Sequence, residues 1–202
     1  MSFNLEGRII ILATGNIHKF NETRAVLSEY DIITGMLKIK TLEIQSESLE
    51  DIAKASVQEA YKKCNLPIIV EDAGLFVKKL NGFPGPYAAY VYKTIGNKGL
   101  LELMKSVENR EAEFQSVIAF RSARLETPMC FSGGVLGEIT KEERTANIAM
   151  GFGFDPIFKP KKNKKTFAEM TLKEKNKHSH RANALRKFGE WYRKMQQQET
   201  LA

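Results

Sequence analysis

The chain has 202 residues, of which 43% are hydrophobic and 27% are charged, a mixture that excludes a disordered chain and fits one domain. The formal net charge of +7 favours an anionic partner, such as a nucleotide, a nucleic acid or an acidic surface. Two widely separated cysteines, no signal-like start and no apolar run of membrane-spanning length predict a cytoplasmic protein outside any membrane.

The N-terminal third alternates strand and helix signals. Branched apolar runs predict buried strands, and the i, i+3, i+4 spacing of apolar residues predicts helices. The expected elements are a strand at 8–13, a turn at 14–16, helices at 17–30 and 49–63, and a short strand at 68–70 that ends at Glu71 and Asp72.

The remaining residues add a run of strands to this alternation. The expected elements are loops at 81–86 and 151–160, a helix at 100–107, antiparallel strands at 114–120 and 129–139, and basic helical residues at 170–195. Strand–helix alternation followed by consecutive strands predicts an α/β fold with a mixed β-sheet flanked by helices. Ligands in such folds bind beyond the carboxyl ends of strands, where we expect Thr14 and Asp72.

The first candidate site is the turn before the first helix. It comprises Thr14, Gly15, Asn16, Ile17, His18 and Lys19. A helix N-terminus offers free N–H groups, Gly15 permits close approach of a ligand, and Lys19 adds positive charge, so the turn suits phosphate. The spacing is not that of a P-loop. An ordinary Asn-capped helix with a solvated lysine is the alternative.

The second candidate is the carboxylate pair Glu71 and Asp72. Neighbouring strand residues point to opposite faces, so only one of the two can face a given pocket. That carboxylate is a candidate ligand for Mg²⁺, which binds through one or two carboxylates together with substrate phosphates. Glu43 is a candidate second carboxylate, and a solvated turn is the alternative.

Two later segments add aromatic and basic candidates. Phe152, Gly153, Phe154 and Asp155 form a glycine-flexed aromatic loop that can stack on a base, or simply be buried. The basic segment 173–181 is either a solvated helix face or a nucleotide contact. In the second case Lys175 binds phosphate, and His180 and Arg181 bind base or phosphate.

Four segments, in this order, resemble the inosine triphosphate pyrophosphatase family, also called non-canonical purine NTP pyrophosphatases. The segments are residues 12–16 with Lys19 and Glu22, residues 71–75 with 80–87, residues 151–158 with 167–170, and residues 174–176 with 179–181 and 184–185. The resemblance spans roughly residues 9–190. Each motif alone is weak, and four at similar spacings make a strong signal.

The resemblance implies hydrolysis of ITP, dITP and XTP between the α- and β-phosphates with Mg²⁺, which removes deaminated purines from the nucleotide pool. It implies one elongated domain with two lobes, a central cleft and a homodimeric state. By motif, residues 14–19 hold the triphosphate together with Ala73. Glu43 and Asp72 bind metal, and Asp72 is the candidate base for the attacking water. Residues 152–155, His180 and Arg181 line the base pocket, with Lys175 near phosphate or sugar.

This sequence departs from the family pattern in several places. Ala73 replaces a hydroxyl residue, and Phe154 replaces Tyr or Trp. Ala89 lies where many members have a cation, and Ser56 stands near the place of a common lysine. These differences concern phosphate binding rather than family membership.

Two other functions are consistent with parts of the sequence. The charge and the lysine-rich residues 159–165 are typical of a nucleic-acid-binding module, whose binding falls steeply with salt. A related pyrophosphatase acting on pyrimidine or modified nucleotides is the other alternative. The aromatic loop with His180 and Arg181 favours a purine nucleotide. No nucleic-acid partner is expected, because the aromatic residues are not interleaved with the lysines and the lysine run sits on a predicted loop.

Overall fold

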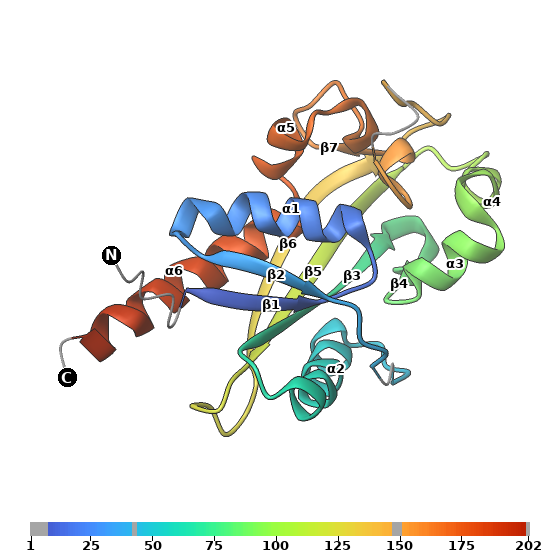
Figure 1. Cartoon of the computed structure of the whole chain (residues 1–202). Helices are drawn as coiled ribbons and strands as arrows, with labels where there is room; N and C mark the ends of the chain where they lie inside the picture. Colours follow the sequence, from blue (N-terminus) through green and yellow to red (C-terminus); the bar gives the residue numbers. More distant parts are fainter. Residues whose placement is uncertain (1–7, 42–43, 147–150, 201–202) are drawn as a thin grey trace. The chain divides into compact units, whose positions relative to one another are not determined.

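The computed structural model describes residues 8–41, 44–146 and 151–200, and Figure 1 shows the path of the chain. The strands of this described part are β1 (Ile9–Ala13), β2 (Ile33–Leu37), β3 (Ile68–Val77), β4 (Pro84–Gly85), β5 (Glu111–Arg121), β6 (Met129–Ile139) and β7 (Phe158–Pro160). The helices that position the site are α1 (Ile17–Leu27), α2 (Leu49–Cys64), α3 (Ala88–Thr94), α4 (Gly96–Leu103), α5 (Leu172–Asn176) and α6 (His180–Thr200).

Within the described ranges, seven strands form one sheet in the order β2-β1-β3-β5-β6-β7, and β4 pairs with β3. β1 is parallel to β2 and β3, whereas the β3–β4 and β6–β7 pairs are antiparallel. The predicted α/β fold with a mixed sheet flanked by helices is therefore confirmed.

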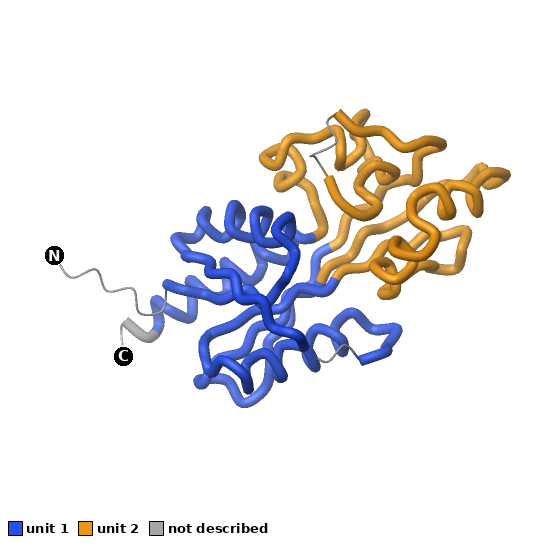
Figure 2. Tube along the Cα trace, turned by 45° about the vertical axis from the view of Figure 1, so that its right-hand side comes forward, with its two compact units in different colours: residues 1–72, 117–133, 181–202 blue, residues 73–116, 134–180 orange. Residues whose placement is uncertain are grey.

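The chain divides into two compact units, coloured in Figure 2. Unit 1 comprises residues 1–72, 117–133 and 181–202, and unit 2 comprises residues 73–116 and 134–180. The chain therefore passes from one unit to the other within β3, β5 and β6 and at the start of α6. The expectation of a single domain with two lobes and a cleft stays a prediction.

The core of unit 1 joins the first strand to the first and last helices. Ile10 and Leu12 of β1 pack with Leu27 of α1 and with Leu185 and Phe188 of α6. In Figure 1, α1 and α6 lie on one side of β1 and β2, and α2 lies on the other. The apolar side of α2 is buried as its spacing predicted, through Leu49, Ile52, Ala53, Val57 and Ala60. These contacts hold the strand–turn–helix segment that begins the candidate site.

The core of unit 2 is built around aromatic rings. Phe114 of β5 contacts Phe158 of β7 edge-on, with 4.6 Å between ring centroids, and Phe167 also packs in this cluster. Helices α3 and α4 add Val91 and Leu100. Phe154 of the aromatic loop is itself part of this core.

Two expectations from the sequence were wrong in detail. β3 does not end before Glu71 but continues to Val77, because Leu75 and Phe76 pair with β4. The expected loop at 151–160 includes strand β7, which pairs with β6. The expectation that residues 170–195 are mostly helical is confirmed, because α5 and α6 cover most of this segment.

Candidate functional site

The predicted phosphate turn forms the start of α1 in unit 1. β1 ends at Ala13, and Asn16 caps the helix by accepting hydrogen bonds on Oδ1 from the backbone N–H groups of His18 (2.9 Å) and Lys19 (3.2 Å). The N–H of Asn16 in turn donates to Thr14 Oγ1 at 3.1 Å. Gly15, Ile17 and His18 are exposed. The same geometry is consistent both with an ordinary Asn-capped helix and with a phosphate-binding turn. Asn16 already accepts hydrogen bonds from two of the N–H groups at the start of the helix.

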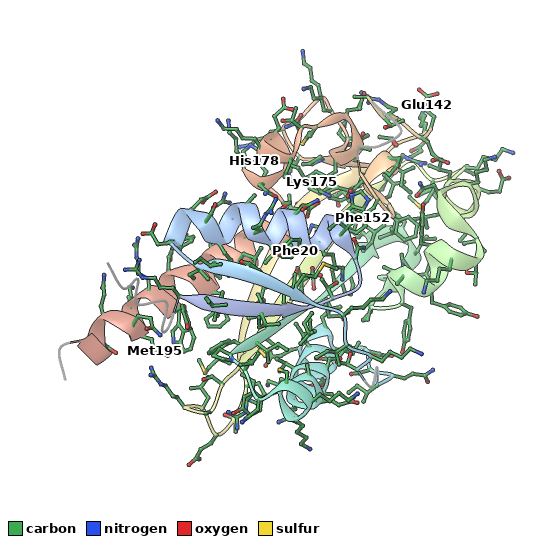
Figure 3. The ribbon with its side chains drawn as sticks, viewed as in Figure 1. Phe20, Glu142, Phe152, Lys175, His178 and Met195 are labelled. Carbon is green, nitrogen blue, oxygen red and sulfur yellow. The ribbon has the colours of Figure 1, made fainter. Side chains whose placement is uncertain are left out.

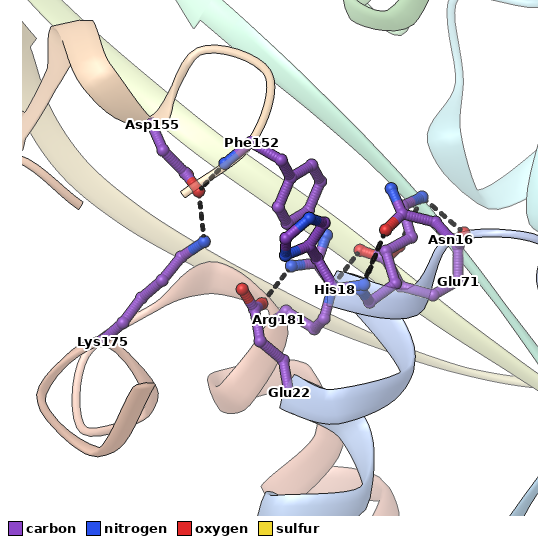
Figure 4. Close-up of polar contacts among 9 residues, drawn as sticks. Asn16, His18, Glu22, Glu71, Phe152, Asp155, Lys175 and Arg181 are labelled. Atoms are coloured by element: carbon purple, nitrogen blue, oxygen red, sulfur yellow. Dashed lines mark hydrogen bonds and ion pairs between the residues drawn. The ribbon is translucent and has the colours of Figure 1, made fainter. Parts of the chain in front are cut away.

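Glu71 connects this turn to the last helix of the same unit. Its Oε2 forms an ion pair with Lys19 Nζ at 2.7 Å, and its Oε1 lies 3.1 Å from Arg181 Nε. Arg181 also pairs, through Nη1, with Glu22 of α1. Figure 4 shows these contacts. The carboxylate of Glu71 thus holds both Lys19, which we expected at the triphosphate, and Arg181, which we expected at the base.

Glu71, Lys19, Arg181 and Glu22 form what we call the Glu71 cluster, and three of these four side chains are almost completely buried. The side chain of Glu71 is 1% exposed, that of Arg181 3% and that of Glu22 5%, whereas Lys19 is 24% exposed. Breaking a buried ion pair by removing one partner costs about 3–5 kcal/mol, because the other charge remains buried. The cluster therefore holds its side chains firmly, with Lys19 as its most exposed member.

Asp72 lies next to Glu71 inside β3, not at a strand end, and is half-buried. Because neighbouring strand residues point to opposite faces, Asp72 is directed away from the face on which Glu71 meets Lys19 and Arg181. Ala73 follows in the same strand as the first residue of unit 2. Glu71 and Asp72 are thus neighbours within one strand, which agrees with the expectation that only one of the two carboxylates can face a given pocket.

A metal site around Asp72 would have few protein ligands. Among residues 8–41, 44–146 and 151–200, no three His, Cys, Asp or Glu side chains gather as a possible metal site. Mg²⁺ usually keeps several waters and binds through one or two carboxylates plus substrate phosphates, so a half-buried Asp72 fits that ion. Glu43, the other predicted ligand, lies outside the described residues.

The aromatic loop of unit 2 is held by a buried ion pair. Asp155 Oδ2 accepts a hydrogen bond from the N–H of Phe152 at 2.9 Å and binds Lys175 Nζ at 2.6 Å. Both charged side chains are at most 5% exposed. The Lys175 ammonium lies 4.9 Å from the centroid of the Phe152 ring. In Figure 3, Lys175 and Phe152 are labelled on their segments of the ribbon.

The two phenylalanines of this loop have different environments. Phe154 is buried in the core of unit 2, with its ring edge-on to Tyr92 at 5.6 Å between centroids. Phe152 is only half-buried. Gly151 and Gly153 adopt φ values of 84° and 60°, which glycine permits without strain. Of the two rings, Phe152 is therefore the one with surface available for stacking.

Helix α5 places Lys175 by means of a capping box. Thr171 Oγ1 accepts from the N–H of Glu174, and the Glu174 carboxylate accepts from the N–H of Thr171. The Lys165 ammonium, 2.8 Å from Glu174, and these capping hydrogen bonds lower the pKa of the Glu174 carboxyl to about 2. The Glu174 carboxylate is therefore charged at neutral pH, and the capping box stabilises the short helix that carries Lys175.

His180 and Arg181 are adjacent in sequence but have different partners. His180 is buried in unit 2, stacked on Phe114 with 4.6 Å between ring centroids and 11° between planes. Arg181 belongs to the Glu71 cluster of unit 1. The predicted site residues thus form two clusters, one in each unit.

The lysine-rich residues 159–165 are partly neutralised. Lys159 pairs with Glu138 and Lys165 with Glu174. This mixture of charges is typical of an ordinary surface more than of a nucleic-acid-binding stripe.

Comparison with known proteins decides the family. The model of the Ham1 family matches residues 10–191, which includes all four motif segments. The chain belongs to the Ham1 family. The resemblance found in the sequence is thereby confirmed.

Several relatives of this Ham1-family chain share one name. It is 47% identical over 190 residues to a dITP/XTP pyrophosphatase of Hyperthermus butylicus, covering 94% of this chain and 97% of the relative. It is 45% identical over 184 residues to a dITP/XTP pyrophosphatase of Methanopyrus kandleri, covering 91% and 96%. A solved HAM1 protein from Coxiella burnetii is similar in fold, with a TM-score of 0.77, 29% identity, and coverage of 90% of this chain and 96% of that one.

Proposed function

We propose that this Ham1-family protein hydrolyses dITP, ITP and XTP to the nucleoside monophosphate and pyrophosphate. The observation that carries the proposal is the 45–47% identity, over more than nine-tenths of both chains, to proteins named dITP/XTP pyrophosphatase. Removal of deaminated purines from the nucleotide pool is the biological consequence.

The unit 1 residues fit the phosphate part of this reaction. Hydrolysis at phosphorus depends on positioning and on positive charge around the phosphate oxygens. The start of α1 and Lys19 supply such charge at the carboxyl end of β1. Asp72 is the proposed base that orients or deprotonates the attacking water.

Magnesium is part of the proposal. Asp72, with Glu43, would hold the ion, which when bound neutralises charge on the phosphate oxygens. The protein's own contribution is then to place the nucleotide and the water.

In unit 1, Arg181 is proposed to take part in choosing the base. Inosine and xanthosine carry a 6-oxo group where adenine has an amino group, and a guanidinium donates hydrogen bonds only. Arg181 is fixed by Glu22 and Glu71, and a donor fixed in this way favours an oxygen over an amino group.

A cytoplasmic location and a homodimer complete the proposal. Among the residues that the structure describes, no helix is long and apolar enough to cross a membrane. The substrates in the relatives' names, dITP and XTP, are free nucleotides, which the cytoplasm supplies. Size-exclusion chromatography with light scattering tests the dimer.

The decisive experiment is product analysis with ITP, dITP, XTP, ATP, GTP and dUTP in the presence of Mg²⁺. Pyrophosphate and monophosphate from ITP, dITP and XTP, with little turnover of ATP, are expected. Orthophosphate with a nucleoside diphosphate would contradict the proposed bond cleavage. Preferred turnover of dUTP would instead favour the pyrimidine alternative.

A further inference from the structure

The Glu71 cluster leaves the phosphate turn with little net charge of its own. Lys19 and Arg181 are balanced by Glu71 and Glu22 among the described residues of unit 1. A triphosphate carries several negative charges, and a neutral cluster attracts it only weakly. Besides the proposed Mg²⁺, a positively charged residue outside this cluster would therefore strengthen the binding of a triphosphate near the turn.

Lys38 lies at the required place. β2 runs parallel to β1 with Leu37 opposite Ala13, and the N–H of Thr14 donates to Leu37 O at 3.1 Å. Lys38 follows Leu37 directly, so it stands beside Thr14 at the carboxyl end of the two strands. Ligands of open α/β sheets bind at this end.

The side chain of Lys38 lies across Gly15. A Cβ placed on Gly15 would lie 3.6 Å from Lys38 Cε and 3.8 Å from its Cγ, which is van der Waals contact. The aliphatic part of the Lys38 side chain therefore runs along the turn beside Gly15. Lys38 itself is exposed, and among residues 8–41, 44–146 and 151–200 it forms no ion pair within 4.0 Å.

We propose that Lys38 is a phosphate-binding residue whose ammonium contacts the polyphosphate of a nucleotide seated on residues 14–19. This inference rests on the proposed function, because it assigns a new residue to the same site. Lys38 supplies charge that Lys19, paired with Glu71, does not supply in full. Because Gly15 has no side chain, the methylenes of Lys38 can pack along the turn.

Three variants separate a direct contact from general electrostatics. Lys38→Met removes the charge and keeps the length of the side chain, and Lys38→Arg keeps the charge. Lys40→Met is the matched control, since Lys40 is also an exposed lysine, two residues further along the same segment. KM and kcat for dITP with Mg²⁺, and the Kd of inorganic tripolyphosphate measured by calorimetry, are the readouts.

Lys38→Met is expected to raise KM for dITP and Kd for tripolyphosphate about tenfold, as for loss of one charge-assisted hydrogen bond. Lys38→Arg is expected to stay within about threefold of the wild type, and Lys40→Met within about twofold. Equal effects of Lys38→Met and Lys40→Met, or no effect of either, would overturn the inference. If wild-type protein releases no pyrophosphate from dITP, the proposed function fails, and the calorimetric series still decides the role of Lys38.

Discussion

Glu71 and Arg181 are 110 residues apart in the sequence, yet Glu71 Oε1 lies 3.1 Å from Arg181 Nε in a region where both side chains are at most 3% exposed. The other oxygen of the same carboxylate pairs with Lys19 at 2.7 Å. A buried charge is costly unless it is paired, so these residues depend on one another.

Glu71→Gln is therefore expected to lower the free energy of unfolding by about 3–5 kcal/mol, because it leaves Arg181 and Lys19 without this carboxylate. Urea denaturation measures the change. Glu50→Gln is the matched control, since it breaks the exposed ion pair with Lys54. The control is expected to cost about 0.5 kcal/mol or less. Equal losses in the two variants would show that burial of Glu71 has no energetic consequence.

Asp72→Asn is expected to lower kcat for dITP by about 10²–10⁴-fold, in keeping with loss of a general base. The free energy of unfolding is expected to change by less than about 1 kcal/mol, because Asp72 is only half-buried. Steady-state kinetics and urea denaturation measure the two effects. Full activity of the variant would remove Asp72 from the proposed mechanism.

Asp155→Ala is expected to free the aromatic loop of unit 2. It removes the acceptor for the Phe152 N–H and leaves the buried ammonium of Lys175 unpaired. Hydrogen exchange of the Phe152 amide is expected to accelerate at least about tenfold, since about 1.4 kcal/mol of lost protection gives that factor. Glu138→Gln, which breaks the more exposed pair with Lys159 in the same unit, is expected to leave this amide unchanged.

Glu174 provides a pH-dependent prediction. Its pKa is about 2 in the folded chain, below the usual 4.5 of a glutamate, because Lys165 and the Thr171 cap favour the charged form. A lowered carboxyl pKa stabilises the fold fully above the unfolded value, and this contribution is lost as pH falls from about 4.5 through about 2.

An NMR titration of the Glu174 side-chain carboxyl carbon measures this pKa directly. In parallel, the difference in Tm between wild type and Glu174→Gln is expected to be constant above about pH 4.5 and to shrink towards pH 2. A titration midpoint of Glu174 near 4.5 would show that its contacts with Lys165 and Thr171 are not formed in solution.

Local patterns in the sequence predicted the elements that have a clear period. The apolar run at 9–13 became β1, and the i, i+3, i+4 spacing at 49–63 became α2. Helix α3 was not predicted, because only Ala88 and Val91 of its seven residues are buried and no apolar stripe results. The continuation of β3 past Asp72 depends on pairing with β4, which local sequence does not reveal.

The candidate site was predicted as a set of motifs but not as a set of contacts. Glu71 was recognised as one of two neighbouring carboxylates, and its partners Lys19 and Arg181 come from segments distant in the sequence. A glutamate inside an apolar strand signals that a cation must be near, since such residues are almost never fully buried unpaired. Which cation is near depends on the packing of α1 and α6.

The place of α6 in the core has a consequence for synthesis on the ribosome. Leu185 and Phe188 pack with Ile10 and Leu12, which are synthesised well before them, so the core of unit 1 stays incomplete until α6 has emerged. All core residues of unit 2 precede α6 in the chain. During translation, unit 2 can therefore assemble its core earlier, while β1 must wait for α6 to emerge.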